Sequence, residues 1–256
     1  MSAPSPTDRF LPSLLEGDTD ETHALFGGEG DVDDPFNGRI VDPGFYMWAA
    51  AKHLWLRGFG GTLEAVRTTR SGSRACAEWI IHFDDYRGRK TSVPLAVVGE
   101  EAGERLLRAR IYHSMWPLYS AHEVRPPTVP IDQELMLRDG DPVAIYQQAL
   151  ARGDVEGVLA TFEDDATVRE PSGGEWVYST PERRRELYTA MLAAGGIPLS
   201  HCAVIDDGEA CVLEYIVHRW GPTALPPQAG VAVYVRGPRG KLVAARIYDD
   251  VTPPSG

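Results

Sequence analysis

The sequence matches itself when it is shifted by 136 residues, so that position 109 falls on position 245. Both copies carry the four residues Ala-Arg-Ile-Tyr in this register, at 109–112 and at 245–248. Near the start of each copy the matched positions are apolar, glycine or acidic: Leu14, Gly17 and Asp18 against Leu150, Gly153 and Asp154. A shared register over this distance indicates a duplication. We therefore expect two homologous domains, each with its own core.

The chain of 256 residues is long enough for two domains of ordinary size. We place the first domain at residues 1–118, a linker at 119–140 and the second domain at 141–256. The linker contains Arg-Pro-Pro-Thr-Val-Pro, and prolines at this density favour a semi-rigid spacer.

Signals for three helices precede most of the strands in the second copy. Asp141 and Pro142 are typical of a helix start, and Gly153 is typical of a helix end. Thr180 has the same capping character for a later helix. The predicted helices run from Pro142 to Gly153, from Val155 to Phe162 and from Pro181 to Gly195.

The remaining segments of the second copy read as strands separated by turns. The predicted strands are 166–171, one that ends at Ile205, a long one through Trp220, and two more near 229–236 and 241–250. Three helices on one face of a curved, mostly antiparallel sheet make an α+β domain.

Each copy has an acidic residue directly before a proline at the same place in the repeat, Asp34-Pro35 and Glu170-Pro171. Proline restricts the preceding residue to an extended backbone. The carboxyl group before each proline is therefore held in a defined direction.

The stretch Ala151–Pro171, ARGDVEGVLATFEDDATVREP, resembles the N-terminal signature of ketosteroid isomerases and SnoaL-like cyclases of the nuclear-transport-factor-2-like superfamily. The resemblance implies two cone-shaped domains, in which Glu170 and Asp34 lie at the mouth of a pocket. It also matches Tyr146 by spacing to the family's oxyanion-binding tyrosine. The family's second acidic residue is missing, because Ala96 and Ala232 stand at its aligned positions.

A Glu-x-x-x-His pattern lies on the long strand of each copy, as Glu214 with His218 and Glu78 with His82. Residues two apart on a strand share a face, so each pair points to the same side. Threaded on the family, that side is the cavity wall. Ion pairs with arginines such as Arg246 are the structural alternative.

A second resemblance is to polyether epoxide hydrolases, which can also be fused pairs of such domains. They combine the acid before proline with another acid at the start of the next long strand. Glu64 is near that position in the first copy, and Ser200 and His201 are near it in the second. The resemblance implies that one acid protonates the epoxide oxygen while the other carboxylate takes a proton from the attacking hydroxyl.

These features predict a cofactor-free acid–base enzyme, a cyclase, isomerase or epoxide hydrolase that acts on a hydrophobic polyketide or polyether intermediate. Glu170 is the expected base, Tyr146 the hydrogen-bond donor, and His218 with Glu214 the proton partner. The alternative from another class is a non-catalytic module of the same fold that binds a small molecule or docks to a protein.

The net charge of −12 argues against a nucleic-acid or anionic-membrane surface. The N-terminus lacks a signal peptide pattern, so we expect a cytoplasmic protein. Glu-x-x-x-His on a strand is poor metal geometry, and no metal site is expected. The domains are expected to form an internal pseudo-dimer through the outward faces of their sheets, with aromatic area from four residues: Trp79, Tyr112, Tyr215 and Tyr248.

Overall fold

The computed structural model describes residues 4–85, 87–170 and 176–252. The chain divides into two compact units, Met1–Ser120 and Ala121–Gly256. The sequence-predicted linker at 119–140 is therefore grouped largely with the second unit. The arrangement of the two units as a pseudo-dimer stays a prediction.

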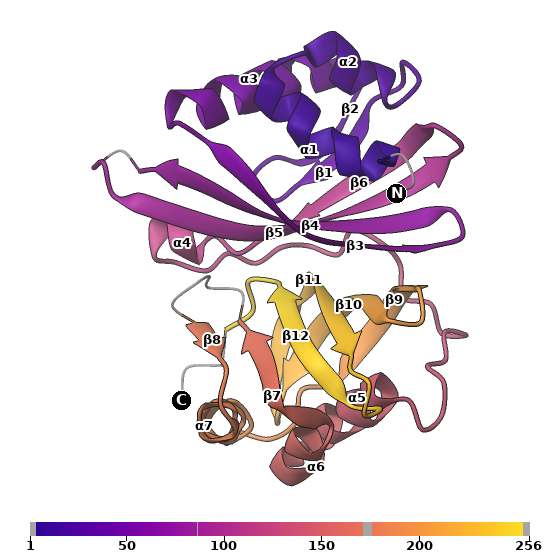
Figure 1. The fold of residues 1–256 in the computed structure, drawn as a ribbon, viewed down its shortest axis with the longest axis vertical. Coiled ribbons are helices and arrows are strands. Elements are labelled where there is room, and N and C mark those ends of the chain that lie inside the picture. The colour runs from indigo at the N-terminus through magenta and orange to yellow at the C-terminus, as the bar shows by residue number, and fades with distance from the viewer. Residues whose placement is uncertain (1–3, 86, 171–175, 253–256) are drawn as a thin grey trace. The chain divides into compact units, whose positions relative to one another are not determined.

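The first unit begins with helices and continues into a meander of strands (Figure 1). Its elements are α1 (Pro6–Glu16), α2 (Thr19–Ala24), β1 (Asp31–Asp34), β2 (Gly38–Val41), α3 (Gly44–Gly58), β3 (Thr62–Ser71), β4 (Arg74–Asp84), β5 (Lys90–Ala102), β6 (Arg105–Tyr112) and α4 (Trp116–Tyr119).

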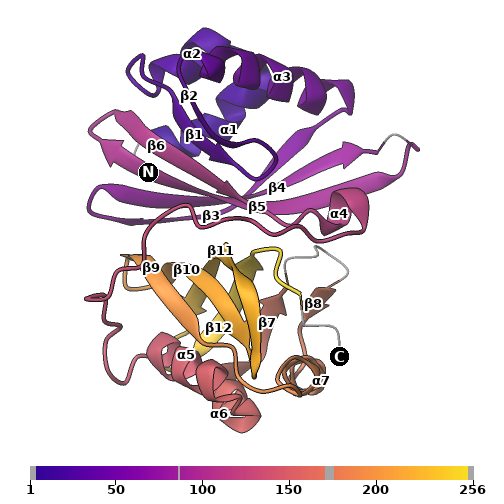
Figure 2. The same cartoon turned by 180° about the vertical axis from the view of Figure 1, so that it is seen from behind.

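The second unit repeats this order up to its last strand (Figure 2). Its elements are α5 (Pro142–Arg152), α6 (Val155–Ala160), β7 (Phe162–Arg169), β8 (Val177–Tyr178), α7 (Pro181–Met191), β9 (Leu199–Asp206), β10 (Ala210–Trp220), β11 (Thr223–Arg236) and β12 (Leu242–Tyr248).

The two units share one sheet topology. The strand orders are β2-β1-β6-β5-β4-β3 and β8-β7-β12-β11-β10-β9. In each sheet one pair is parallel, β1 with β6 and β7 with β12, and the other pairs are antiparallel. The first three helices of each unit lie together on one side of its sheet (Figures 1 and 2). The predicted α+β class with two tandem domains is confirmed.

Capping residues set several helix boundaries as the sequence predicts. The Asp141 side chain accepts a hydrogen bond from the backbone of Val143, and Gly153 ends α5 with a φ of 72°. A left-handed φ of this kind favours glycine. The Thr180 side chain likewise caps α7. Some ends differ from prediction, since Phe162 begins β7 and α7 stops at Met191, before Gly195.

The repeat is not in one register throughout, because the strands β5 and β11 differ by one residue. Glu78 pairs with Ala96 across the first sheet. Its counterpart Glu214 pairs with Val231 and not with Ala232. Ala232 therefore lies in the core of the second unit, on the side opposite to Glu214. The prediction that the two copies match without a gap at a shift of 136 residues is therefore wrong at β5 and β11.

Residues of the connecting segment bind to the second unit. The His122 ring contacts Asp250 at 2.7 Å, and the backbone N–H of Glu123 donates to the same carboxylate at 2.6 Å. Farther along, the carbonyl of Arg125 accepts a hydrogen bond from the N–H of Ala229. These contacts fix the segment beside the end of β12.

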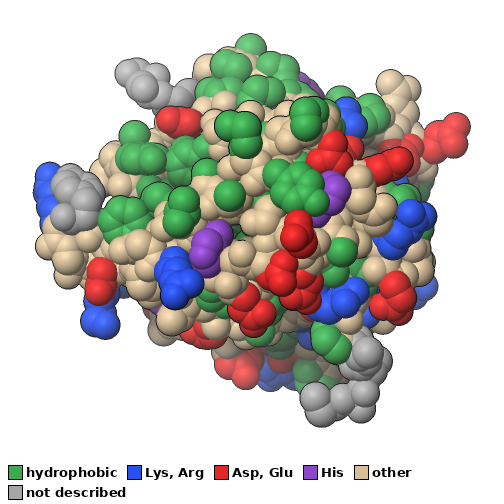
Figure 3. All heavy atoms as spheres, turned by 90° about the horizontal axis from the view of Figure 1, so that it is seen from above, with side chains coloured by type: hydrophobic (Ala, Val, Ile, Leu, Met, Phe, Trp, Pro, Cys, Tyr) green, Lys and Arg blue, Asp and Glu red, His purple; other side chains and the backbone are tan. Residues whose placement is uncertain are grey.

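No helix in the described part of the chain is long and apolar enough to cross a bilayer. The helical face of the first unit is mixed in character, with hydrophobic, acidic and basic side chains next to one another (Figure 3). Met47 and Leu54 of α3 are among its exposed apolar side chains.

A buried arginine joins α7 to β7. Arg184 is 2% exposed, and its guanidinium donates to the carbonyl of Ala166 and, at 2.9 and 3.0 Å, to those of Glu163 and Asp164. These carbonyls belong to residues between Phe162 and Thr167, the positions of β7 that pair with β12 on either side of a register shift. The neighbouring Arg185 pairs instead with exposed Glu156.

We predict that Arg184→Ala lowers the free energy of unfolding of the second unit by about 3 kcal/mol, because buried carbonyls lose charged donors. Arg185→Ala is the matched control and should leave stability almost unchanged, since its ion pair is exposed. Native-state hydrogen exchange reads the amides of the two sheets separately. Equal losses of protection in the two variants would contradict the assignment.

Candidate functional site

The second unit encloses a cavity of about 60 Å³ between its helices and its sheet. This volume is room for roughly four waters or for one small group of a larger molecule. Most of the wall is aliphatic or aromatic. The lining residues are Tyr146, Leu150, Glu170, Met191, Ile197, Leu199, Tyr215, Val217, Trp220, Tyr234, Ile247, Asp249 and Val251.

Glu170 follows the last residue of β7, and its backbone N–H donates to the carbonyl of Trp176 at 3.2 Å. Burial of the carboxyl group is the main cause that raises its pKa to about 8, and the nearby charge of Asp249 adds to the rise. Glu170 is thus protonated at neutral pH. Its neighbour Pro171 lies outside the described residues, but Asp34 before Pro35 ends β1 in extended conformation as predicted.

Asp249 lines the same cavity directly after β12. The hydroxyl of Tyr215 donates to its carboxylate at 2.6 Å, and the N–H of Val251 donates at 3.1 Å. Burial raises the pKa of Asp249 to about 6, against the lowering effect of these two hydrogen bonds. At neutral pH this carboxyl is ionised while that of Glu170 is not.

Four tyrosines surround the two carboxyls and supply neutral donors. The hydroxyls of Tyr146 and Tyr188 lie 3.1 Å apart, and the amide of Gln147 donates to Tyr234 at 2.8 Å. Burial raises the pKa of Tyr146, Tyr188 and Tyr234 well above the ordinary value. Their phenols therefore stay protonated, and Tyr146 lies in the cavity where its predicted role would place it.

The prediction that Glu214 and His218 of β10 face the cavity is wrong. Tyr215 and Val217 line the cavity, so Glu214 and His218, on alternate positions of the same strand, point to the other side of the sheet. Glu214 is buried there, while His218 is exposed with its Nδ1 3.5 Å from the hydroxyl of Ser200. The expectation that Tyr215 lies on the outward face is wrong for the same reason.

The prediction for the equivalent face of β4 is wrong in the same way. Ile81 lines the first unit's cavity, and Glu78 and His82 alternate with it on the opposite side. His82 bonds to Glu64 through Nε2 at 3.0 Å and to Ser92 through Nδ1 at 2.8 Å. The structure thus brings Glu64 and His82 together, but away from the cavity.

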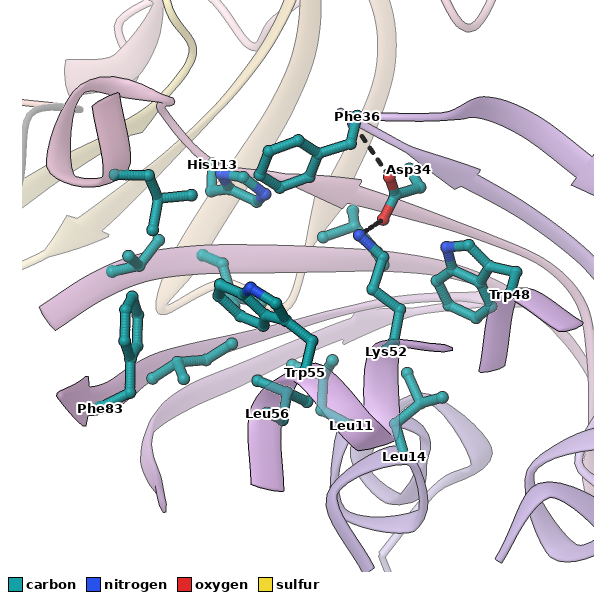
Figure 4. Close-up of a pocket in the computed structure, with 15 residues that line it drawn as sticks. Leu11, Leu14, Asp34, Phe36, Trp48, Lys52, Trp55, Leu56, Phe83 and His113 are labelled. Carbon is teal, nitrogen blue, oxygen red and sulfur yellow. Dashed lines mark hydrogen bonds and ion pairs between the residues drawn. The ribbon is translucent and has the colours of Figure 1, made fainter. Parts of the chain in front are cut away.

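The first unit has its own cavity of about 60 Å³, shown in Figure 4. Asp34 lies in its wall, 3% exposed, and accepts hydrogen bonds from the N–H groups of Phe36 and Asn37 at 2.9 and 3.0 Å. The ammonium group of Lys52 completes an ion pair with Asp34 at 2.9 Å. The charge of Asp34, the acid before proline, is therefore balanced by Lys52 in this unit.

The site residues predicted from the sequence do not include Asp249 or Lys52. By the shift of 136, Asp249 corresponds to His113, and Lys52 corresponds to Tyr188. All four occupy positions at or beside a cavity wall. A signal was available, because chemically different residues stand directly after the repeated Ala-Arg-Ile-Tyr.

In the described part of the chain, no group of three or more His, Cys, Asp or Glu side chains is placed to hold a metal ion. The carboxyls of Glu170 and Asp249 and the phenols of Tyr146, Tyr215 and Tyr234 line the cavity of the second unit.

No family model and no curated protein matches the chain. Solved structures with a similar fold include a putative polyketide cyclase from Sinorhizobium meliloti, with 18% identity, a TM-score of 0.36, and coverage of 42% of this chain and 93% of that chain. Another is SalBIII, an epoxide hydrolase/cyclase-like enzyme in pyran ring formation of the polyether salinomycin, with 20% identity, a TM-score of 0.37, and coverage of 42% and 87%.

A third is a protein with a ketosteroid isomerase-like fold from Catenulispora acidiphila, solved with trimethylamine, with 13% identity, a TM-score of 0.39, and coverage of 46% and 92%. The fold families named in these structures are the ones that the sequence resembles. Each match covers less than half of this chain, and identities this low carry no activity or ligand over to it.

We predict that the two carboxyls titrate separately, Glu170 with a pKa of about 8 and Asp249 with a pKa of about 6. Asp249→Asn should lower the pKa of Glu170, since a repelling charge is removed. Tyr215→Phe should raise that of Asp249, because a hydrogen bond to the ionised form is lost. Carboxyl ¹³C NMR measures both. A measured pKa of Glu170 near 4.5, or a pKa that does not change in Asp249→Asn, would contradict the described environment.

The raised pKa of Glu170 also predicts the pH dependence of stability. The folded state holds this proton more tightly than the unfolded state, whose pKa is near 4.5. The contribution of Glu170 is therefore fully present below pH 4.5 and is lost as the pH rises through about 8. The difference in unfolding free energy between the wild type and Glu170→Gln should change in this window, and a flat difference would refute the prediction.

Proposed function

We propose that the second unit is a cofactor-free acid–base catalyst for a neutral, apolar small molecule, and that its reaction is an epoxide-opening cyclisation. The observation that supports this is the pair of carboxyls in one apolar cavity with pKa values of about 8 and about 6. Near pH 7 roughly nine in ten molecules hold Glu170 protonated, and a similar share hold Asp249 ionised. Such a split assigns one acid and one base.

This assignment reverses the role expected for Glu170. The carboxyl of Glu170 donates its proton to the epoxide oxygen as a C–O bond of the ring breaks. The carboxylate of Asp249 accepts the proton of the substrate hydroxyl as its oxygen bonds to the released carbon. The product is one molecule, a cyclic ether that carries the former epoxide oxygen as a hydroxyl group, and the transferred protons balance.

After one turnover Glu170 is ionised and Asp249 carries a proton. Transfer of that proton from Asp249 to Glu170 restores the starting state, and it is favourable because Glu170 has the higher pKa. The enzyme therefore needs no outside acid or base to complete the cycle. Tyr215 holds Asp249 through a hydrogen bond of 2.6 Å throughout.

The apolar wall has a direct role in this chemistry. Leu199, Val217 and Ile247 surround the carboxyls with apolar side chains, and burial keeps the pKa of Glu170 high enough for an acid. The same wall favours an intramolecular hydroxyl over water as nucleophile. Cyclisation is thus preferred over hydrolysis in this cavity.

We predict that Glu170→Gln and Asp249→Asn each lower kcat/KM for a linear 4,5-epoxy alcohol by about 10²- to 10⁴-fold. The measured product is the substituted tetrahydrofuran, resolved by chromatography. For the wild type, kcat/KM should follow a bell-shaped pH profile with limbs near 6 and 8, set by Asp249 and Glu170.

The matched control is His218→Gln, an exposed site on the other side of β10, which should leave turnover unchanged. Asp34→Asn should also leave it unchanged, because Asp34 is ion-paired in the other unit. Full activity in Glu170→Gln would remove the proposed acid. Turnover of a β,γ-unsaturated ketone in place of the epoxide would replace cyclisation by isomerisation with the same two carboxyls.

A further inference from the structure

The cavity of the first unit differs in chemistry from that of the second. Its wall is made largely of aliphatic and aromatic side chains, among them Trp48, Trp55 and Phe83. Its ionisable groups are Asp34, Lys52 and His113, of which Asp34 and Lys52 form an ion pair at 2.9 Å (Figure 4). The Lys52 ammonium also lies 4.5 Å from the centre of the Phe36 ring. The two charges cancel inside the wall.

The indole of Trp48 provides a donor that the protein leaves unused. Trp48 is 7% exposed, and its Nε1–H has no hydrogen-bond partner among the described residues. Figure 4 shows this nitrogen on the side of the ring that faces the Asp34–Lys52 pair. A buried donor without an acceptor costs about 1–3 kcal/mol. Such groups are rare in native proteins, and each calls for a physical explanation.

Packing holds the indole in this orientation. The ring of Trp48 is stacked on Phe10, with centroids 6.2 Å apart and planes at 9°, and it also contacts Phe45 at 5.6 Å. Phe10 and Phe45 are fully buried. The N–H therefore points in a fixed direction, and a ligand gains the hydrogen bond without ordering the donor.

We propose that the first unit binds a neutral apolar molecule with an oxygen acceptor, such as a ketone or cyclic ether, and binds it without turnover. The oxygen accepts the Trp48 indole hydrogen bond, and the ring or chain fills the aliphatic part of the cavity. The volume of about 60 Å³ holds the oxygen-bearing group of such a molecule.

The charge balance selects a neutral ligand over a carboxylate. Asp34 and Lys52 already neutralise each other, so an anion would add an uncompensated charge to a largely apolar site. The same balance excludes turnover by the scheme of the second unit. An ionised Asp34, held by Lys52 and two backbone N–H groups, cannot serve as a proton donor.

The test uses the full chain with ¹⁵N-labelled tryptophan and observes the indole N–H resonance of Trp48, which is assigned by its loss in Trp48→Phe. Cyclopentanone is the probe, and methylenecyclopentane is the control of the same shape without an acceptor. We expect cyclopentanone to move the Trp48 resonance downfield and to bind Trp48→Phe about 3- to 10-fold more weakly. Methylenecyclopentane should bind both proteins equally and cause no downfield shift.

Three outcomes overturn the proposal. The first is an unmoved Trp48 resonance at saturating cyclopentanone, which needs no variant and so does not depend on how Trp48→Phe folds. The second is equal affinity of cyclopentanone for the wild type and Trp48→Phe. The third is preferential binding of cyclopentanecarboxylate, which would replace the neutral ligand with an anion. None of these outcomes bears on Glu170 or Asp249, so the proposed catalyst stands or fails separately.

Discussion

Two carboxyl groups that share one water-poor cavity constrain the whole second unit. An apolar wall disfavours each charge, and the two charges disfavour each other. The two ionised carboxylates are stabilised unequally, since Tyr215 and the backbone N–H of Val251 donate hydrogen bonds to Asp249. Glu170 receives no such donor from the described residues. The proton therefore resides on Glu170, and the acid and the base are distinguished before any substrate arrives.

The two units show how one architecture can hold different chemistry. Both sheets have the same strand order, and both units present an acid to a cavity, Asp34 from the end of β1 and Glu170 from directly after β7. In the first unit Lys52 occupies the position of Tyr188, and the acid becomes one half of an ion pair. The cation at this position thus balances the charge of the acid in the first unit, a pairing that the second unit lacks at Tyr188.

The sequence contained enough information for most of the helices and strands and for the two tandem domains, because caps and glycines are local signals and the repeat marks the duplication. It did not determine the faces of β10. Residues Ala210–Val217 are buried without interruption, so no alternation of polar and apolar residues marks the inner side. Threading then placed Glu214 in the cavity, although Tyr215 lies there. A strand covered on both faces leaves this choice to tertiary packing.

Asp249 was not among the predicted site residues because it is one of two adjacent acids at a strand end, a pattern that usually indicates a solvated terminus. The fold gives the two acids different surroundings. His122 and the N–H of Glu123, from the connecting segment, bind Asp250. With Asp250 held there, the preceding side chain is directed into the cavity, where Tyr215 from β10 donates to it. The segment 119–140, which the sequence predicts to be a spacer, therefore helps to orient Asp249, the proposed base. It does so through its contacts with Asp250.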